Sequence, residues 1–430
     1  MKCTINFLTT PVVDAVNGII IDSVKMGASD IHFDPTDTVL RVRLRVDGIL
    51  DDYANIPEEV KQNIMTRIKI LSGMNITETR LPQDGAIKTK LNGMDLDMRV
   101  ATLPTKKGEK IVIRILDYSR SMQGLEYLFF NEINYKKIMK MISAPNGIIL
   151  VTGATGSGKS TTVYSFLKKL NVKGANLITV EDPVEMDIEG INQVQVNSEI
   201  GLDFATVLRS ILREDPNVIM IGEIRDSETA QIAVRASITG HLVLSTLHTN
   251  NSLNTIERLI DMDVERYLLA SALTGIVSQK LARKLCDKCK KVRETNDYEK
   301  KLFRDVLGKN VEKIYTPVGC SNCSKGYRGR IAVQEVLLIN QEIRDAISSG
   351  LPKKELRKLV YNRDVITLLQ DGLYKVIAGF ISFEEVLKLI EVDDEINAAH
   401  TMGRDEDSKN DNGNNSNHNH NNDDGYRDVI

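Results

Sequence analysis

One glycine-rich segment has the spacing of a phosphate-binding loop. An apolar run at 148–151 (IILV) leads directly into 153–161 (GATGSGKST), which fits the pattern G-x-x-x-x-G-K-[ST]. Glycines let the backbone wrap closely, so that N–H groups face phosphate oxygens, and the following helix adds the positive end of its dipole. We expect Lys159 to reach the β- and γ-phosphates of a nucleotide and Ser160 to bind Mg²⁺. The nucleotide-binding residues predicted in this way are Gly153, Ala154, Thr155, Gly156, Ser157, Gly158, Lys159, Ser160 and Thr161.

Carboxylates follow two further apolar runs. The segment 178–185 (ITVEDPVE) contains Glu181, and 218–223 (VIMIGE) ends in Glu223, one residue after the usual aspartate position of a Walker-B strand. Ligand sites of parallel α/β sheets form at the carboxyl ends of the strands, where these acids are expected. Glu223 could hold the magnesium ion and its water or activate the attacking water, and Glu181 could be a general base or a metal-water ligand. The residues leave both assignments open.

Two histidines flank another apolar run, at 239–250 (TGHLVLSTLHTN). A lone histidine is more often structural. Polar groups at both ends of a core strand beside a phosphate loop nevertheless predict that His241 and His248 sense the γ-phosphate.

Four of the five cysteines form two C-x-x-C pairs separated by thirty residues. Two such pairs can place four thiolates tetrahedrally on Zn²⁺, with no open position for catalysis, so a structural zinc site is predicted. The wide separation leaves room for a helix at about 297–309. The alternative is free thiols in a reducing compartment. The predicted ligands are Cys286, Cys289, Cys320 and Cys323, and Cys3 is expected to be a bystander.

The elements that must position these groups divide the chain into successive regions. A helix at 11–26, strands at 31–33, 39–46 and 111–116, and a helix at 58–71 predict an α+β domain. Strand–loop–helix alternation then predicts a parallel sheet covered by helices. The predicted order is an N-terminal domain (1–118), a linker (119–136), an α/β core (137–281), a cysteine segment (282–332), a helical subdomain (333–395) and a disordered Asn-rich acidic tail (396–430).

Charge and composition exclude several classes of protein. The net charge is −3, and residues 404–430 hold seven acids and three bases, so the tail carries −4 and the rest of the chain +1. This near-neutral body, with no Trp and 5% aromatic residues, does not favour direct nucleic-acid binding. Neither a signal peptide nor a membrane span is expected, and five cysteines do not make a secreted disulfide framework. A cytoplasmic location is therefore predicted.

The motifs GATGSGKST, TVEDPVE, LRSILREDPNVIMIGEIRD and TGHLVLSTLHTN together resemble the GspE/PulE/PilB-like secretion ATPases of type II secretion and type IV pilus assembly. The segments ASDIHFDP, RVRLRVDG, RLPQDG and RVATLPTKKGEKIVIRIL, between residues 28 and 116, resemble the second N-terminal domain of that family. The resemblance covers roughly residues 10–395.

This resemblance implies a hexameric ATPase with a RecA-like P-loop domain, a small PAS-like N-terminal domain, a zinc-binding insert and a C-terminal helical subdomain. ATP and Mg²⁺ would bind between the two main domains, and Zn²⁺ would bind the cysteines. A polytopic inner-membrane platform protein would be the partner, with peripheral association at the cytoplasmic face. The family's functional residues would fall on Lys159, Glu181, Glu223, His241, His248, Arg99 and Arg114. Arg80, Arg209 and Arg213 are weaker candidates, with ordinary salt bridges as the alternative.

Two other functions compete with an assembly motor. A RecA-like motor that translocates nucleic acid, for DNA uptake or conjugation, would need a basic channel with aromatic side chains, which the composition does not favour. A non-catalytic scaffold would be expected to lack Lys159, Glu181 or Glu223, and the sequence has all three.

Overall fold

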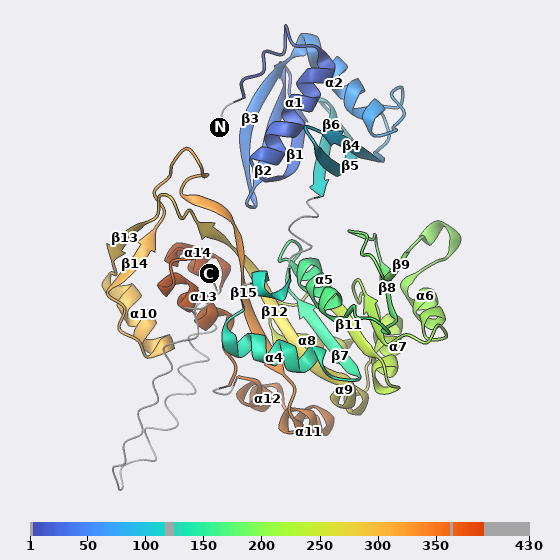
Figure 1. Ribbon diagram of the computed structural model, residues 1–430, viewed down its shortest axis with the longest axis vertical. Coiled ribbons are helices and arrows are strands. Elements are labelled where there is room, and N and C mark those ends of the chain that lie inside the picture. Colours follow the sequence, from blue (N-terminus) through green and yellow to red (C-terminus); the bar gives the residue numbers. More distant parts are fainter. Residues whose placement is uncertain (1–2, 117–123, 129, 362–363, 391–430) are drawn as a thin grey trace. The chain divides into compact units, whose positions relative to one another are not determined.

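The computed structural model describes residues 3–116, 124–128, 130–361 and 364–390, and the predicted tail lies outside these ranges. The chain divides into two compact units (Figure 1). The first holds the residues up to 119 together with Gly319–Gly329, and the second holds 120–318 and the chain from Arg330 onward. Part of the predicted linker is helical, because α4 (Glu132–Ile142) begins inside it. Nowhere in the described ranges is a helix both long and apolar enough to cross a membrane.

The first unit is a six-stranded antiparallel sheet in the order β3-β2-β1-β6-β5-β4 with two helices. Alternation in β2 buries Leu40, Val42 and Leu44, while Arg43 and Arg45 meet acids of β1: Arg43 Nε lies 2.6 Å from Asp34 Oδ2. The unit therefore has the predicted α+β composition, and its PAS-like character stays a prediction. Its elements are α1 (Val12–Lys25), β1 (Ala28–Pro35), β2 (Val39–Val46), β3 (Ile49–Pro57), α2 (Glu58–Leu71), β4 (Gln83–Leu91), β5 (Met94–Thr105) and β6 (Gly108–Leu116).

The second unit is built on a seven-stranded sheet in the order β15-β12-β7-β11-β10-β8-β9. The neighbours from β12 to β9 pair in parallel, so their carboxyl ends share one edge of the sheet. Every residue of β7 and β10 is buried, as expected for apolar runs covered on both faces. The strands are β7 (Gly147–Thr152), β8 (Leu177–Glu181), β9 (Asn192–Gln195), β10 (Val218–Ile221), β11 (Leu242–Leu247), β12 (Leu273–Leu285) and β15 (Tyr327–Leu338).

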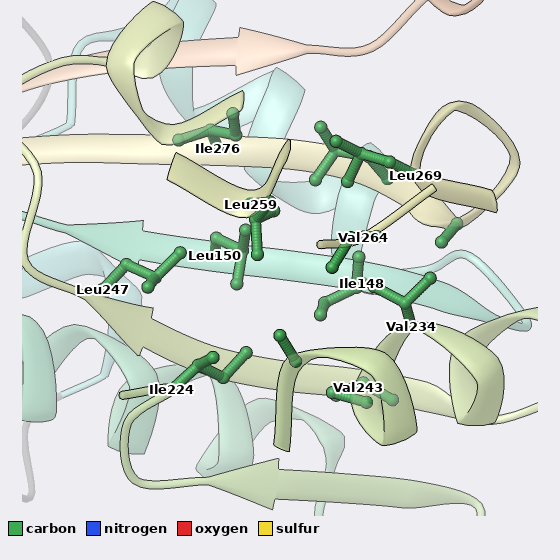
Figure 2. Close-up of a cluster of buried hydrophobic side chains, with 14 of the residues drawn as sticks. Ile148, Leu150, Ile224, Val234, Val243, Leu247, Leu259, Val264, Leu269 and Ile276 are labelled. Carbon is green, nitrogen blue, oxygen red and sulfur yellow. The ribbon is translucent and has the colours of Figure 1, made fainter. Parts of the chain in front are cut away.

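Helices of the second unit connect and cover these strands (Figure 1). A buried core cluster joins the sheet to them and includes Ile148, Leu150, Val234, Val243 and Leu259 (Figure 2). Besides α4, the helices are the short η1 (Leu125–Leu128) and η2 (Ser198–Ile200), then α5 (Lys159–Leu170), α6 (Phe204–Ile211), α7 (Ser227–Ile238), α8 (Ser252–Asp261), α9 (Arg266–Ala272), α10 (Asp297–Leu307), α11 (Gln341–Ser349), α12 (Lys353–Val360), α13 (Leu368–Ile377) and α14 (Phe383–Leu389).

The region around the cysteine segment differs in part from the sequence prediction. The helix expected at about 297–309 is confirmed as α10, beside a small sheet of β13 (Lys291–Glu294) and β14 (Lys313–Thr316). The strand β15, however, crosses the predicted border at 332 and joins the core sheet. Two buried polar residues interrupt its apolar pattern: Gln334 Nε2 donates to Leu128 O at 3.1 Å, and Glu335 accepts from Ser252. Only partners distant in sequence make this strand acceptable in the core.

Candidate active site and metal centre

The glycine-rich loop leaves the sheet at the end of β7 and enters α5. Gly158 is the N-cap of α5 with φ 87°, and no side chain caps this helix. A Cβ atom at Gly153 would lie 2.4 Å from the backbone oxygen of Gln279 and 2.5 Å from Ser157 Oγ, so this position accepts only glycine. The first N–H groups of α5 therefore receive no side-chain acceptor and can receive an anion.

The polar groups of the loop fit a polyphosphate. Lys159 is 9% exposed, and its ammonium donates to the carbonyl oxygens of Gly153 and Ala154 at 2.9 and 3.2 Å. Burial lowers the pKa of Lys159, while the charge of Glu223 opposes that effect. Ser157 Oγ is buried and has no hydrogen-bond partner within the described ranges. A buried ammonium, an unsatisfied hydroxyl and the open end of α5 are all groups that phosphate oxygens can satisfy.

Glu223 lies just beyond β10 in a cluster of charged groups. Arg225 donates a hydrogen bond to Glu223 Oε1, and His248 Nε2 lies 3.4 Å from Glu223 Oε2. Arg225 also lies 3.8 Å from Asp182. Burial alone would raise the pKa of Glu223, but the Arg225 hydrogen bond and the charges of Arg225, His248 and Lys159 hold that pKa below its usual value. Glu223 is therefore an ionised carboxylate at neutral pH.

Glu181, the other candidate acid, has a different environment at the end of β8. It is 2% exposed and accepts hydrogen bonds from Thr179 Oγ1 at 2.6 Å, from Gln193 Nε2 at 3.1 Å and from the Tyr164 hydroxyl. Burial, together with the Glu181 charge, raises the pKa of Tyr164, so this phenol stays protonated and donates. Both carboxylate oxygens of Glu181 thus already have protein donors.

The structure separates the two predicted histidines. His248 follows the carboxyl end of β11 and meets Glu223, but His241 precedes the amino end. Gly147 N donates to His241 O at 3.1 Å, whereas Gly153 N, at the phosphate loop, donates to Leu247 O at 3.3 Å. A six-residue strand spans roughly 20 Å, which is too far for a shared contact. Within one chain, His241 therefore does not share a contact with Glu223, and its ring Nδ1 lies 3.0 Å from Ala236 O at the end of α7. A role of His241 in phosphate sensing stays a prediction.

The predicted N-terminal arginines lie in the first unit. Arg99 on β5 and Arg114 on β6 are direct cross-strand partners. The Arg114 side chain is 67% exposed, with Nε 3.0 Å from Asp30 Oδ1. Among the weaker candidates, Arg80 pairs with Glu78 at 3.0 Å, as the salt-bridge alternative expects. The other two, on or just after α6, make local contacts: Arg209 pairs with Glu228, and Arg213 donates to Arg209 O at 2.7 Å.

The four paired cysteines form one cluster. Their sulfur atoms all lie within 4.8 Å of one another. All five cysteines lie within the described ranges, and none of them forms a disulfide there. Cys320 Sγ lies 3.7 Å from Cys323 Sγ. Four sulfurs placed tetrahedrally at about 2.3 Å from a zinc ion would be about 3.8 Å apart, so this donor set fits Zn²⁺. Cys3 lies against the core of the first unit and is not part of the cluster.

Comparison with known proteins now identifies the family. The family described as "Type II/IV secretion system protein" matches residues 8–388. The chain belongs to this family. It is 43% identical over 380 residues to type II secretion system protein E of Pectobacterium carotovorum subsp. carotovorum, covering 88% of this chain and 76% of that protein. It is also 43% identical over 380 residues to the type IV pilus assembly ATPase PilB of Acinetobacter baylyi, with coverage of 87% and 66%.

Solved structures agree with the fold of this secretion ATPase family. The pilus retraction motor PilT with bound ADP matches with a TM-score of 0.59 and 26% identity, covering 87% of this chain and 96% of that one. The Legionella pneumophila ATPase DotB matches with a TM-score of 0.67 and 22% identity, over 90% and 97%. The second similarity supports the fold alone.

Two residues of the site in this family member carry no sequence signal. Tyr164 sits within α5 and binds Glu181, and Gln279 sits within β12 and binds the phosphate loop. Neither belongs to a motif, and both contacts join residues far apart in the chain. The separation of His241 from His248, in contrast, can be read from the sequence, because His241 precedes its strand and ligands of a parallel sheet gather at the carboxyl ends.

The cysteine cluster predicts one zinc ion per chain. Metal analysis of the purified full chain should find it, and Cys320→Ser should lower the zinc content because three thiolates do not complete a tetrahedral site. Cys3→Ser is the matched control and should keep one zinc. A folded preparation, verified by circular dichroism, that contains no zinc would contradict the assignment.

Proposed function

We propose that this chain is a hexameric ATP hydrolase that drives pseudopilus or type IV pilus assembly, or protein secretion, by acting on a polytopic inner-membrane platform protein. Membership of the secretion ATPase family supports the general activity. The observation that carries the proposal is the juxtaposition of a glycine-rich loop, Lys159, Glu223 and His248 at the carboxyl edge of one parallel sheet. The platform protein, the hexamer and peripheral attachment at the cytoplasmic face belong to the proposal.

The residues of the loop would bind the phosphates of ATP. Lys159 would exchange the carbonyl oxygens of Gly153 and Ala154 for β- and γ-phosphate oxygens, which offer the ammonium a full opposite charge. N–H groups of the loop and of the first turn of α5 would surround the remaining oxygens. Ser160, exposed at the start of α5, and Glu223 would hold Mg²⁺, which neutralises phosphate charge when bound.

Glu223 is the better candidate for orienting or deprotonating the attacking water. Its carboxylate is ionised, and its side chain is partly exposed, at 19%. Glu181 has its oxygens engaged by three protein donors, so we assign it the role of holding Tyr164 and the β8–β9 edge in place. His248, beside Glu223, would respond to the γ-phosphate.

Arg99 and Arg114 would complete the site by neutralising charge that spreads over the transferring phosphoryl group. Their side chains share one face of the sheet as cross-strand partners, so they would act as a pair. ATP would then bind the domains together, and hydrolysis would release them.

Replacing Glu223 or Glu181 by glutamine separates the catalytic role proposed for Glu223 from the structural role proposed for Glu181. Glu223→Gln should lower kcat about 100-fold or more, since a positioned general base contributes at least that much, while ATP still binds. Glu181→Gln should chiefly lower the thermal midpoint, because an amide cannot accept from three donors as the carboxylate does. Steady-state ATP hydrolysis, ATP titration and melting followed by circular dichroism provide the readouts. A Glu181→Gln chain with wild-type stability and the larger loss of kcat would reverse the assignment.

Coupling to a platform predicts a nucleotide-dependent partner. The tagged chain, incubated with detergent-solubilised membranes of its host, should retain a polytopic membrane protein that mass spectrometry identifies. The amount recovered should differ between samples with ATP and samples without nucleotide, because ATP changes the domain arrangement. Recovery of nucleic acid in place of a polytopic protein would contradict the proposal and favour a translocating motor.

A further inference from the structure

Strand β12 carries a glutamine that lies almost wholly buried against the phosphate-binding loop. Gln279 is 2% exposed. Its Nε2 donates to the carbonyl oxygen of Ser157 at 2.7 Å, and its Oε1 accepts from the Thr162 hydroxyl at 2.8 Å. Ser157 lies in the loop, and Thr162 lies in the first turn of α5. Both ends of one amide are therefore bound to the element that would receive the phosphates.

The loop also approaches the backbone and side chain of Gln279 at both of its ends. A Cβ atom at Gly153, where the loop begins, would lie 2.4 Å from Gln279 O. A Cβ atom at Gly158, where it ends, would lie 3.0 Å from Gln279 Nε2. Gln279 directly follows Ser278, which pairs with Thr152 at the end of β7. The loop therefore packs around Gln279, which is the first residue of β12 after the part of the strand that pairs with β7.

Peptide geometry shows what the Ser157 contact does. Across a trans peptide, the carbonyl of one residue and the N–H of the next point in opposite directions, and the single cis bond in the described chain is Asp182–Pro183. Because the Ser157 carbonyl is held on β12, the Gly158 N–H points away from β12. Ala154, Thr155 and Gly156, the preceding residues of the loop, are exposed. The contact therefore turns a carbonyl away from an incoming anion and an N–H toward it.

Ser278, the residue before Gln279, connects β12 to neighbouring elements through hydrogen bonds. Ser278 Oγ lies 3.0 Å from Thr152 Oγ1 and 3.3 Å from Ser252 Oγ. The Ser252 hydroxyl donates to Glu335 Oε1 at 2.6 Å. Hydrogen bonds thus link β12 to β7, to the start of α8 and to β15. A continuous set of buried polar contacts therefore adjoins Gln279 and restricts the movement of this part of β12.

We propose that Gln279 is a positioning residue for phosphate binding, which sets the orientation of the Ser157–Gly158 peptide and the first turn of α5 without touching the nucleotide. The inference rests on the proposed nucleotide site, and it assigns that site a support outside the glycine-rich motif. Its consequence is that nucleotide affinity depends on a side chain of β12, more than one hundred residues beyond the loop.

The test compares ATP affinity in variants of the full chain. Gln279→Met keeps the size of the side chain but loses the donor and the acceptor, so the dissociation constant for Mg²⁺-ATP, measured by calorimetry, should rise about tenfold. Thr162→Val removes only the hydrogen bond from α5 and should raise the dissociation constant about threefold. Hydrogen–deuterium exchange of the loop at 153–162, without nucleotide, should be faster in both variants. Gln334→Met is the control. It removes a fully buried side-chain amide from a different strand, β15, where Gln334 Nε2 binds Leu128 O.

The outcomes separate this inference from the proposed function. Gln334→Met should lower the thermal midpoint and leave the ATP dissociation constant within about twofold of wild type, because its amide does not contact the loop. If Gln279→Met does not fold, Thr162→Val alone decides. Wild-type affinity and wild-type loop exchange in the folded variants would overturn the positioning role. A wild-type chain that does not bind ATP would instead overturn the proposed function.

Discussion

Backbone N–H groups that the fold leaves unused are the constraint on which this site depends. On the same sheet, α6, α7 and α8 begin with side-chain caps from Asp203, Asp226 and Asn251, which accept from the first turn. Helix α5 begins at Gly158, in a left-handed conformation, and has no such cap. Its first N–H groups therefore remain available to a ligand, and the glycines of the loop allow the backbone to approach it.

Parallel strand pairing brings the remaining groups to these N–H donors. The β7 strand delivers the loop, the neighbouring β11 delivers His248, and β10 delivers Glu223, because their carboxyl ends share one edge. Strand β12 supports the loop from the other side through Gln279 and then runs to Leu285, directly before Cys286. The strand beneath the proposed phosphate site thus leads into the cysteine cluster, where a bound metal would fix its end.

Local signals in the sequence predict much of the fold. Helix α2 (Glu58–Leu71) has the bounds that helical periodicity predicts, and strand β10 (Val218–Ile221) covers the apolar part of the segment 218–223. The cysteine spacing likewise predicts the cluster. Strand β15 could not be predicted in the same way, since the side chains of Gln334 and Glu335 look exposed until Leu128 O and Ser252 bind them. The contact of Gln279 could not be predicted because its partner Ser157 lies 122 residues away in the sequence, in the loop between β7 and α5. Only the tertiary fold brings the two residues together.

The central claim is that this sheet edge binds and hydrolyses ATP, and Mg²⁺-dependent turnover by the purified full chain tests it most directly. Wild-type protein should release phosphate, and Lys159→Ala should lose at least about 100-fold of that rate, since it removes a buried charge from the phosphate site. Circular dichroism of both proteins establishes that the fold is retained. Turnover by a folded Lys159→Ala chain at a rate close to wild type would contradict the account.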